Sequence, residues 1–191
     1  MSEQAVADKI YALEQEISKK KEELAVLRRD EEKLVITDYE LRDKNGKKIA
    51  LSELFRDSDT LFVIQNMGSS CSYCTLWAYE INGILHHLES IAPVILASSD
   101  EPETMRDFAE GRNWNFNLVS TAGAEFKKTL GFEPKQASPH PGVSILKKKD
   151  DGTIFQYTKA SFGPGDDFCG MWSFVRMLPE EQTNWHPKKN Y

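Results

Sequence analysis

Cys71 and Cys74 are the two residues whose type and spacing point most directly to chemistry. They follow the apolar run Leu61–Ile64, which predicts a buried strand, and the break at residues 68–70. The segment 72–91 then predicts a helix, so Cys71 would lie beside the unpaired N–H groups of its first turn. These groups and the positive end of the helix dipole favour a thiolate over a thiol. The spacing therefore predicts a pair that cycles between dithiol and disulfide.

The position of each cysteine predicts its role. Cys71 is nearer the helix start and is the expected nucleophile, and Cys74, one turn into the helix, would resolve the mixed disulfide. Ser72 and Tyr73 lie between them and are expected to tune the pair and to contribute to substrate binding. The expected substrate is a protein or small-molecule thiol or disulfide.

Two other interpretations of the CxxC pair remain open at this point. The cysteines could be small apolar residues packed under a helix. They could also form half of a zinc site, but structural zinc needs four ligands and the chain has no second CxxC. Cys169 and the pair His86-His87 lack metal-ligand spacing to Cys71 and Cys74. We therefore expect no metal and no cofactor, and we expect Cys169 to be buried unless it reaches Cys71 as a second resolving thiol.

Composition limits the class of protein. Of 191 residues, 40% are hydrophobic and 28% charged, which is ordinary for a globular chain, and the net charge of −6 argues against a nucleic-acid surface. No apolar stretch reaches the length of a membrane span, and the N-terminus lacks the apolar region of a secretory signal. Three cysteines do not make a disulfide scaffold. These features predict a cytoplasmic protein without membrane partners.

Residues 3–34 carry a heptad pattern with charged residues between the seam positions. The seam consists of Val6, Ile10, Leu13, Ile17, Lys20, Leu24, Leu27, Glu31 and Leu34. Sustained spacing of four and three predicts a long helix that serves as a dimerisation arm. The alternatives are a helix folded back on its own domain and a helix that is only partly ordered. The predicted organisation is a helix over 1–34, a domain over 35–180 and a polar tail over 181–191.

After residue 35, short strands alternate with helices, and turn signals separate them. Strands are predicted at 35–39, 48–51, 61–64, 93–97, 116–119, 143–146 and 153–157, and helices at 52–55, 72–91, 102–112, 123–130 and 166–178. Asn45-Gly46 and Asp151-Gly152 predict tight hairpin turns, and Ser52 is the expected cap of the helix 52–55. The alternation predicts an α/β fold in which helices cover both faces of a mixed sheet.

The order of these elements resembles the thioredoxin fold, and residues 39–55 look like the N-terminal hairpin that peroxiredoxins add to it. A closer resemblance is to an uncharacterised thioredoxin-like family, found mostly in bacteria and catalogued as a domain of unknown function. The motifs that carry it are Asp38-Tyr39, Leu51–Phe55, Cys71–Ala78, Asn82-Gly83, Pro141-Gly142 and Phe155–Thr158. The resemblance spans nearly the whole chain and implies a thioredoxin-like fold.

The resemblance also implies further site residues. Thioredoxin relatives place a cis-proline opposite the CxxC, where the backbone pairs with substrate, and Pro141 is the candidate, with Pro139 or an ordinary trans-proline as alternatives. Peroxiredoxins place a threonine three residues before the nucleophile, and Gly68 at that position argues against peroxide reduction. The predicted function is a thiol–disulfide oxidoreductase. The alternative is a non-catalytic or redox-sensing interaction module that dimerises through residues 3–34.

Overall fold

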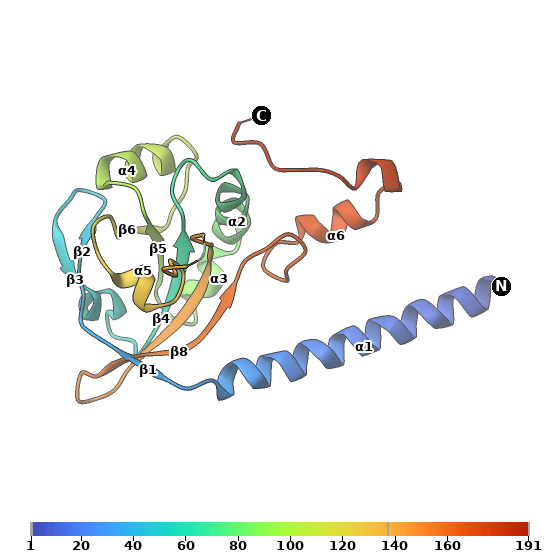
Figure 1. Cartoon of the computed structure of the whole chain (residues 1–191), viewed down its shortest axis with the longest axis horizontal. Helices are drawn as coiled ribbons and strands as arrows, with labels where there is room; N and C mark the ends of the chain where they lie inside the picture. The colour runs from blue at the N-terminus through green and yellow to red at the C-terminus, as the bar shows by residue number, and fades with distance from the viewer. Residues whose placement is uncertain (1, 137, 191) are drawn as a thin grey trace. The chain divides into compact units, whose positions relative to one another are not determined.

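The computed structural model describes residues 2–136 and 138–190, which are shown in Figure 1. Their strands are β1 (Leu34–Ile36), β2 (Glu40–Asp43), β3 (Lys48–Ala50), β4 (Thr60–Asn66), β5 (Val94–Ser98), β6 (Asn117–Ser120), β7 (Gly142–Lys148) and β8 (Ile154–Ser161). Their helices are α1 (Glu3–Asp30), η1 (Leu51–Phe55), α2 (Ser72–Gly83), α3 (Leu85–Glu89), α4 (Pro102–Glu110), α5 (Phe126–Thr129), α6 (Met171–Arg176) and η2 (Glu180–Gln182).

The described strands form one mixed sheet in the order β1-β8-β7-β4-β5-β6-β2-β3. Only β4, β5 and β6 run parallel to one another, with helices connecting them, while the other neighbours are antiparallel. The pair β2–β3 is the N-terminal hairpin, and it adds to the sheet through β6. The predicted thioredoxin-like fold, with its added hairpin and long N-terminal helix, is confirmed.

Helices cover both faces of the sheet because side chains of the central strands alternate between two hydrophobic clusters. Val63, Ile95 and Val119 belong to one cluster, and Ile64, Leu96 and Leu118 belong to the other. The first cluster is completed by side chains of η1 and α5, and the second by side chains of α2, α3 and α4. The cysteine loop follows β4, so it leaves the centre of a sheet that is packed on both sides.

The predicted helix over 72–91 is wrong in its length, because it is divided into α2 and α3. Ile84 separates the two, with φ −111° and ψ 10°, directly after Gly83. Glycine has a low helix propensity, and the neighbouring Asn82 uses its side-chain oxygen to accept a hydrogen bond from the backbone of Asn115, at 2.7 Å. The helix that carries the cysteines is therefore twelve residues long.

Three other predicted helices also differ from the structure. The helix 52–55 begins one residue earlier, and Ser52 does not cap it, since its backbone and hydroxyl both donate to Asp38. The helix 123–130 is shortened to α5, after a turn in which Gly123 has φ +78°. The helix 166–178 is shortened to α6, because the Asp166 carboxylate accepts from the backbone of Gly163 and Phe168 and holds that segment as a turn.

The chain divides into two compact units, residues 1–33 and 34–191. In the first unit, α1 is an uninterrupted helix of 28 residues that is capped by Ser2, whose hydroxyl accepts from the backbone N–H of Ala5 at 3.3 Å. It ends at Asp30, before the predicted boundary, because Leu34 already belongs to β1. None of its residues is buried. Among the described residues, no helix is both long enough and apolar enough to cross a membrane.

Candidate functional site

Cys71 is the N-cap of α2, as the sequence predicts. Its Sγ accepts a hydrogen bond from the backbone N–H of Cys74 at 3.0 Å, so it takes up one of the unpaired donors of the first turn. Its carbonyl accepts from both the backbone and the hydroxyl of Thr75, at 3.1 and 2.9 Å. The Cys71 side chain is half-buried, whereas Cys74 is only 2% exposed. Access from outside therefore favours Cys71 as the nucleophile.

The same geometry separates the pKa values of the two thiols. The Cys74 side chain donates to the Cys71 sulfur, and together with the backbone N–H groups of Cys74 and Tyr73 it lowers the pKa of Cys71 to about 7, against the opposing effect of burial. The pKa of Cys74 is raised, because its proton is held by Cys71 and because it is buried. Near neutral pH the pair thus holds one thiolate, on the more exposed sulfur.

Lys127 of α5 is a buried cation at the end of β4, where the cysteine loop begins. It is 3% exposed, and its ammonium donates to the carbonyl of Asn66 and to Oγ of Ser99, the latter at 2.8 Å. Burial lowers the pKa of Lys127 to about 8, and the nearby acidic groups of Glu133, Cys74 and Asp100 partly offset this effect. Its charge in turn lowers the pKa of Cys74, against the larger effects that raise it. Lys127 thus supplies positive charge to the buried thiol.

The loop between β4 and Cys71 is shaped by Gly68 and Asp100. Gly68 has φ +110°, a conformation that side chains strongly disfavour, and a Cβ atom there would lie 2.6 Å from Oδ1 of Asp100. The backbone N–H of Ser69 donates to Oδ2 of Asp100 at 2.6 Å. Asn66 adds a second tie, since its side-chain oxygen accepts from the backbone of Gly68 at 2.8 Å. The threonine that peroxiredoxins place at position 68 would not fit this loop.

We expect Gly68→Ala to lower the free energy of unfolding by about 1–3 kcal/mol, since alanine is strained at this φ and clashes with Asp100. Gly83→Ala is the matched control, because a Cβ at Gly83 meets no atom within 4 Å and Gly83 has ordinary helical surroundings. Urea unfolding followed by circular dichroism measures both. Equal stabilities of the two variants would contradict the strained loop.

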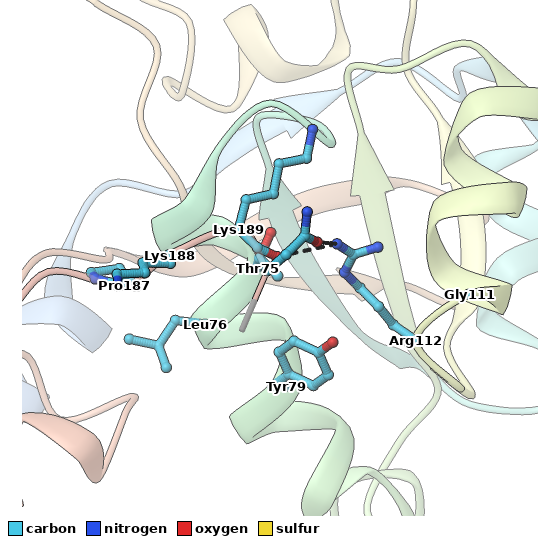
Figure 2. A pocket seen from close by; sticks show the side chains of 9 residues that line it. Thr75, Leu76, Tyr79, Gly111, Arg112, Pro187, Lys188 and Lys189 are labelled. Carbon is cyan, nitrogen blue, oxygen red and sulfur yellow. Dashed lines mark hydrogen bonds between the residues drawn. The ribbon is translucent and has the colours of Figure 1, made fainter.

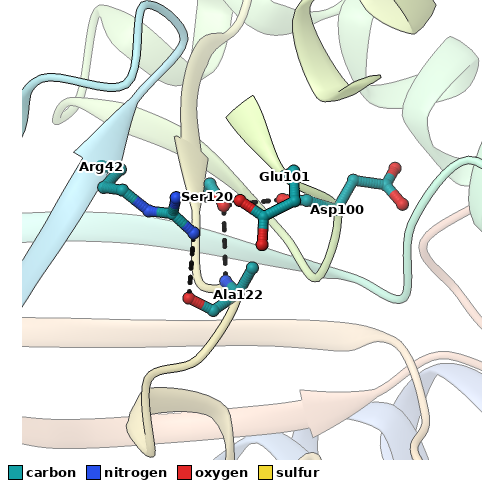
Figure 3. A network of polar contacts seen from close by, with 5 residues as sticks. All are labelled: Arg42, Asp100, Glu101, Ser120 and Ala122. Carbon is teal, nitrogen blue, oxygen red and sulfur yellow. Dashed lines mark hydrogen bonds and ion pairs between the residues drawn. The ribbon is translucent and has the colours of Figure 1, made fainter. Parts of the chain in front are cut away.

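A network of polar contacts, shown in Figure 3, holds Asp100 and its neighbours in place. Ser120 Oγ donates to the carbonyl of Asp100 at 2.6 Å and accepts from the backbone N–H of Ala122 at 3.3 Å. Arg42 of β2 donates to the carbonyl of Ala122 at 3.2 Å and forms an ion pair with Glu101 at 2.8 Å. The N-terminal hairpin is thereby tied to the segment that positions the cysteine loop.

Tyr73 connects the CxxC pair to the C-terminal segment. Its hydroxyl lies 2.6 Å from Nδ1 of His186, and its ring packs against both Trp77 and Trp172, with centroids 6.0 and 6.1 Å away. Trp185 also contacts Trp172. The segment that the sequence predicts as a polar tail thus lies against the helix of the cysteines. Ser72, the other residue between the cysteines, is half-buried at the start of α2.

A cavity of about 440 Å³ lies where this C-terminal segment meets α2, as Figure 2 shows. Its lining consists of Thr75, Leu76, Tyr79, Gly111, Arg112, Pro187, Lys188, Lys189 and Asn190. Arg112 lies over the ring of Phe108 at 3.5 Å and donates to the carbonyl of Lys189 and to the side chain of Asn190. The size suits a small molecule, and Thr75, next to Cys74, brings the cavity close to the CxxC pair.

Pro141 lies at the end of the sheet that carries the cysteine loop, because Gln65 of β4 pairs with Gly142. Pro141 is not the cis-proline for which it was the candidate. It has the ordinary trans bond that was the alternative, since the described residues contain no cis peptide bond. The carbonyl of Pro141 accepts from the backbone of Phe162 at 2.9 Å, and the N–H of His140 donates to Phe132 at 3.0 Å. These two groups already pair within the domain, so they do not present the free backbone groups that an extended substrate would pair with.

Cys169 is buried, as predicted, at 2% exposure. Its sulfur lies 3.9 Å from Oε2 of Glu80, which is six residues beyond Cys74 on α2 and therefore about 9 Å further along the helix axis. A disulfide from Cys169 to Cys71 would require the backbone to move. Trp77 is likewise a core residue, at 2% exposure. No group of three or more His, Cys, Asp or Glu side chains among the described residues is arranged to hold a metal ion.

Sequence reasoning missed Lys127, Asp100 and the contact of His186 with Tyr73. Asp100 had a usable signal, because polar residues that follow a buried parallel strand gather at the same edge of the sheet as the loop of the next strand. The signal for Lys127 was weak, since it lies beside Phe126 on a short helix and lysines seldom face inward. No pattern in the sequence predicts the contact of His186, which depends on the path of the C-terminal segment.

Three solved structures illustrate the similarity of the fold. Peroxiredoxin Q of Xanthomonas campestris is 16% identical over 72% of this chain and 87% of that one, with a TM-score of 0.55. The peroxidoxin BcpB of Mycobacterium tuberculosis is 18% identical over 66% and 82%, with a TM-score of 0.51. A putative electron transfer protein of Aquifex aeolicus is 15% identical over 79% and 92%, with a TM-score of 0.52. At these identities the similarity establishes the thioredoxin-like fold and nothing finer.

A comparison of the sequence with curated proteins found no match. The comparison with protein families did find one, and it extends over residues 3–191, so it includes α1, the CxxC loop and the C-terminal segment. The chain belongs to the family described as bacterial protein of unknown function, DUF899, and its fold makes it a thioredoxin-like member.

Proposed function

We propose that this protein is a thiol–disulfide oxidoreductase that uses Cys71 as nucleophile and Cys74 as resolving thiol. The observation that carries the proposal is the N-cap position of Cys71, where its sulfur accepts from the backbone N–H of Cys74 and its pKa falls to about 7. A cysteine that is only a packed apolar residue would have no such donors, and burial would raise its pKa.

The reaction begins when the Cys71 thiolate attacks one sulfur of a substrate disulfide. A bond forms between Cys71 and that sulfur, and the other substrate sulfur leaves as a thiolate that takes up a proton. Cys74 then loses its proton and attacks Sγ of Cys71, which releases the second substrate thiol. The substrate disulfide is reduced by two electrons, and the protein dithiol is oxidised to the Cys71–Cys74 disulfide. Two external thiols, or one external dithiol, reduce this disulfide through a second mixed disulfide, are themselves oxidised to a disulfide, and complete the cycle.

The opposed pKa values suit these two steps. About half of Cys71 is ionised at pH 7 and it attacks first, whereas Cys74 keeps its proton until the mixed disulfide has formed. Once Cys71 is bound to substrate it no longer carries charge, so the effect of its thiolate in raising the pKa of Cys74 disappears. The ammonium of Lys127 then favours the Cys74 thiolate. Lys127 is proposed as a positioning residue that acts through Cys74 and does not contact the substrate.

The proposed substrate is a protein or small-molecule disulfide that approaches the exposed side of the half-buried Cys71 side chain. Ser72 and Tyr73 border this approach, although the Tyr73 hydroxyl is occupied by His186. Pro141 is buried, and its carbonyl already pairs with Phe162. We therefore propose that Pro141 shapes the surface beside the cysteine loop and does not pair with the substrate backbone. Alkyl peroxide reduction is named for a structurally similar bacterioferritin comigratory protein of Xanthomonas campestris. It is not favoured here, because Gly68 offers no hydroxyl to position a peroxide.

The deciding experiment is a redox titration of the purified protein in dithiothreitol buffers, with thiol alkylation and mass spectrometry to identify each oxidised cysteine. We expect one reversible two-electron transition of Cys71 and Cys74, at a potential between about −270 and −120 mV. We expect Cys71→Ser to abolish disulfide reduction and Cys74→Ser to accumulate a mixed disulfide at Cys71. Cys169→Ser is the control and should leave both results unchanged, because Cys169 lies against Glu80.

If Cys71 and Cys74 form no reversible disulfide at any potential, the oxidoreductase proposal is wrong. The two cysteines would then serve as packing residues, and the interaction module would be the better account of the chain.

A further inference from the structure

The helix α1, which belongs to the first unit of the chain, carries an apolar seam along one face. The seam residues Val6, Ile10, Leu13, Ile17, Leu24 and Leu27 are each 40–66% exposed. In heptad notation, Ile10, Ile17 and Leu24 occupy a positions, and Val6, Leu13, Lys20 and Leu27 occupy d positions. These seven positions make up three and a half heptads, which is within the length at which a sustained heptad pattern indicates a coiled coil. A 28-residue helix with such a seam favours a partner helix.

We propose that the partner is α1 of a second copy of this chain, in a parallel, in-register, two-stranded coiled coil. The seam residues support two strands. β-branched isoleucine at a with leucine at d is the combination that favours parallel dimers over trimers and tetramers. This chain has isoleucine at two of the three a positions, Ile10 and Ile17, and leucine at two of the four d positions, Leu13 and Leu27. The proposal goes beyond the redox function, since it concerns the first unit of the chain alone.

The charges beside the seam select the parallel orientation. In a parallel, in-register pair, each g residue faces the e residue five positions later on the partner helix. The three charged combinations are Lys9 with Glu14, Glu16 with Lys21, and Glu23 with Arg28. All three are attractive, and each occurs twice in the dimer. The two antiparallel alignments that overlap the seam most fully are mixed. One places Glu16 opposite Glu16 and Lys9 opposite Glu23, and the other places Glu16 opposite Glu23 and Glu14 opposite Lys21, so attraction and repulsion offset each other.

Lys20 is the polar residue in the seam, and its surroundings are compatible with this arrangement. Its ammonium pairs with Glu23 of its own helix at 2.8 Å. This ion pair holds the positive charge beside the seam and away from the apolar centre. A single polar residue at a seam position fixes the register, because any shifted alignment would place it against apolar residues of the partner. In register, the two Lys20 side chains share one layer and leave the other layers apolar.

The first experiment measures the mass of the full-length protein by sedimentation equilibrium at micromolar concentrations. We expect a dimer. In Ile10→Lys/Ile17→Lys, the dissociation constant should rise by at least about a hundredfold, since two apolar layers are replaced by charge. The matched control is Gln15→Lys/Ser18→Lys, which adds the same charge away from the seam and should remain a dimer. A monomeric wild type, or a dimer that the seam variant leaves unchanged, would overturn the proposal.

The second experiment tests orientation and register. Val6→Cys is introduced into a full-length chain in which Cys71, Cys74 and Cys169 are all replaced by serine. A parallel, in-register pair brings both copies of residue 6 within disulfide distance, so mild oxidation should yield a covalent dimer. In an antiparallel pair, residue 6 faces the opposite end of the partner helix and no such dimer forms. A non-covalent dimer without this disulfide would therefore disprove the parallel arrangement.

Discussion

The pKa of Cys71 is expected to rise from about 7 toward the ordinary cysteine value of about 8.5 when Cys74 is replaced by alanine. The hydrogen bond from the Cys74 side chain is the largest cause of the depressed pKa, and alanine removes it. At pH 7 the thiolate fraction of Cys71 should fall from about one half to a few per cent, which is roughly 15-fold. Thiolate ultraviolet absorbance and the pH profile of iodoacetamide alkylation both measure this change.

Two further variants make this test specific to the hydrogen bond. Cys74→Ser keeps a donor at the same position and should give a smaller shift in the pKa of Cys71 than Cys74→Ala. Cys169→Ala should give none, because Cys169 lies just before α6 and contacts Glu80 of α2, six residues beyond Cys74. A Cys74→Ala variant whose alkylation midpoint stays near pH 7 would show that the helix start alone sets the pKa of Cys71.

The depressed pKa of Cys71 also makes stability depend on pH. The folded protein releases the proton near pH 7, whereas the unfolded chain keeps it until about pH 8.5. Between these values the unfolded state binds more protons, so the contribution of Cys71 to the free energy of unfolding grows as the pH rises. It is lost as the pH falls through 7.

Lys127→Met is expected to slow the attack of Cys74 on a mixed disulfide about tenfold at pH 7. Methionine fills a similar volume but removes the positive charge that favours the Cys74 thiolate. It also leaves the carbonyl of Asn66 and the hydroxyl of Ser99 without this donor, at a cost to stability of about 1–3 kcal/mol. Release of a chromophoric thiol from a mixed disulfide at Cys71 measures the rate, and urea unfolding measures the stability.

The pH dependence distinguishes the charge of Lys127 from its packing. The pKa of Lys127 is about 8, so the wild-type ammonium loses its proton above that pH and the two rates should converge. A difference that persists unchanged well above pH 8 would indicate a purely structural effect. Lys128→Met is the matched control, since Lys128 is exposed on the same helix and pairs with Glu125, and it should leave the rate unchanged.

Much of the fold was predictable because it depends on local patterns. The short apolar runs at 61–64 and 93–97 alternate with helical segments, and turn pairs such as Asn45-Gly46 fix the hairpins. Helix ends were less predictable, because they depend on distant partners. Ser52 looks like a helix cap by its type, but the side chain of Asp38 is its partner, and no local pattern contains that contact.

The candidate site was likewise predictable only in the part that depends on local sequence. The N-cap position of Cys71 follows from the order of strand, loop and helix in the sequence. Lys127 acts on Cys74 only because α5 packs against the ends of β4 and β5, where its ammonium meets the carbonyl of Asn66 and the hydroxyl of Ser99. That juxtaposition depends on how the sheet is assembled, and a single sequence does not contain it.

The strand order has a consequence for how the protein is made. The cysteine loop follows β4, whose neighbour β7 begins only at Gly142 and is completed in turn by β8. Bacterial and eukaryotic ribosomes add roughly 5–20 residues per second, so both cysteines leave the ribosome several seconds before this side of the sheet can form. Lys127 is also added in that interval. During synthesis the two thiols are those of an unfolded chain, with ordinary acidity, and Cys71 becomes a reactive thiolate only when nearly the whole domain has emerged.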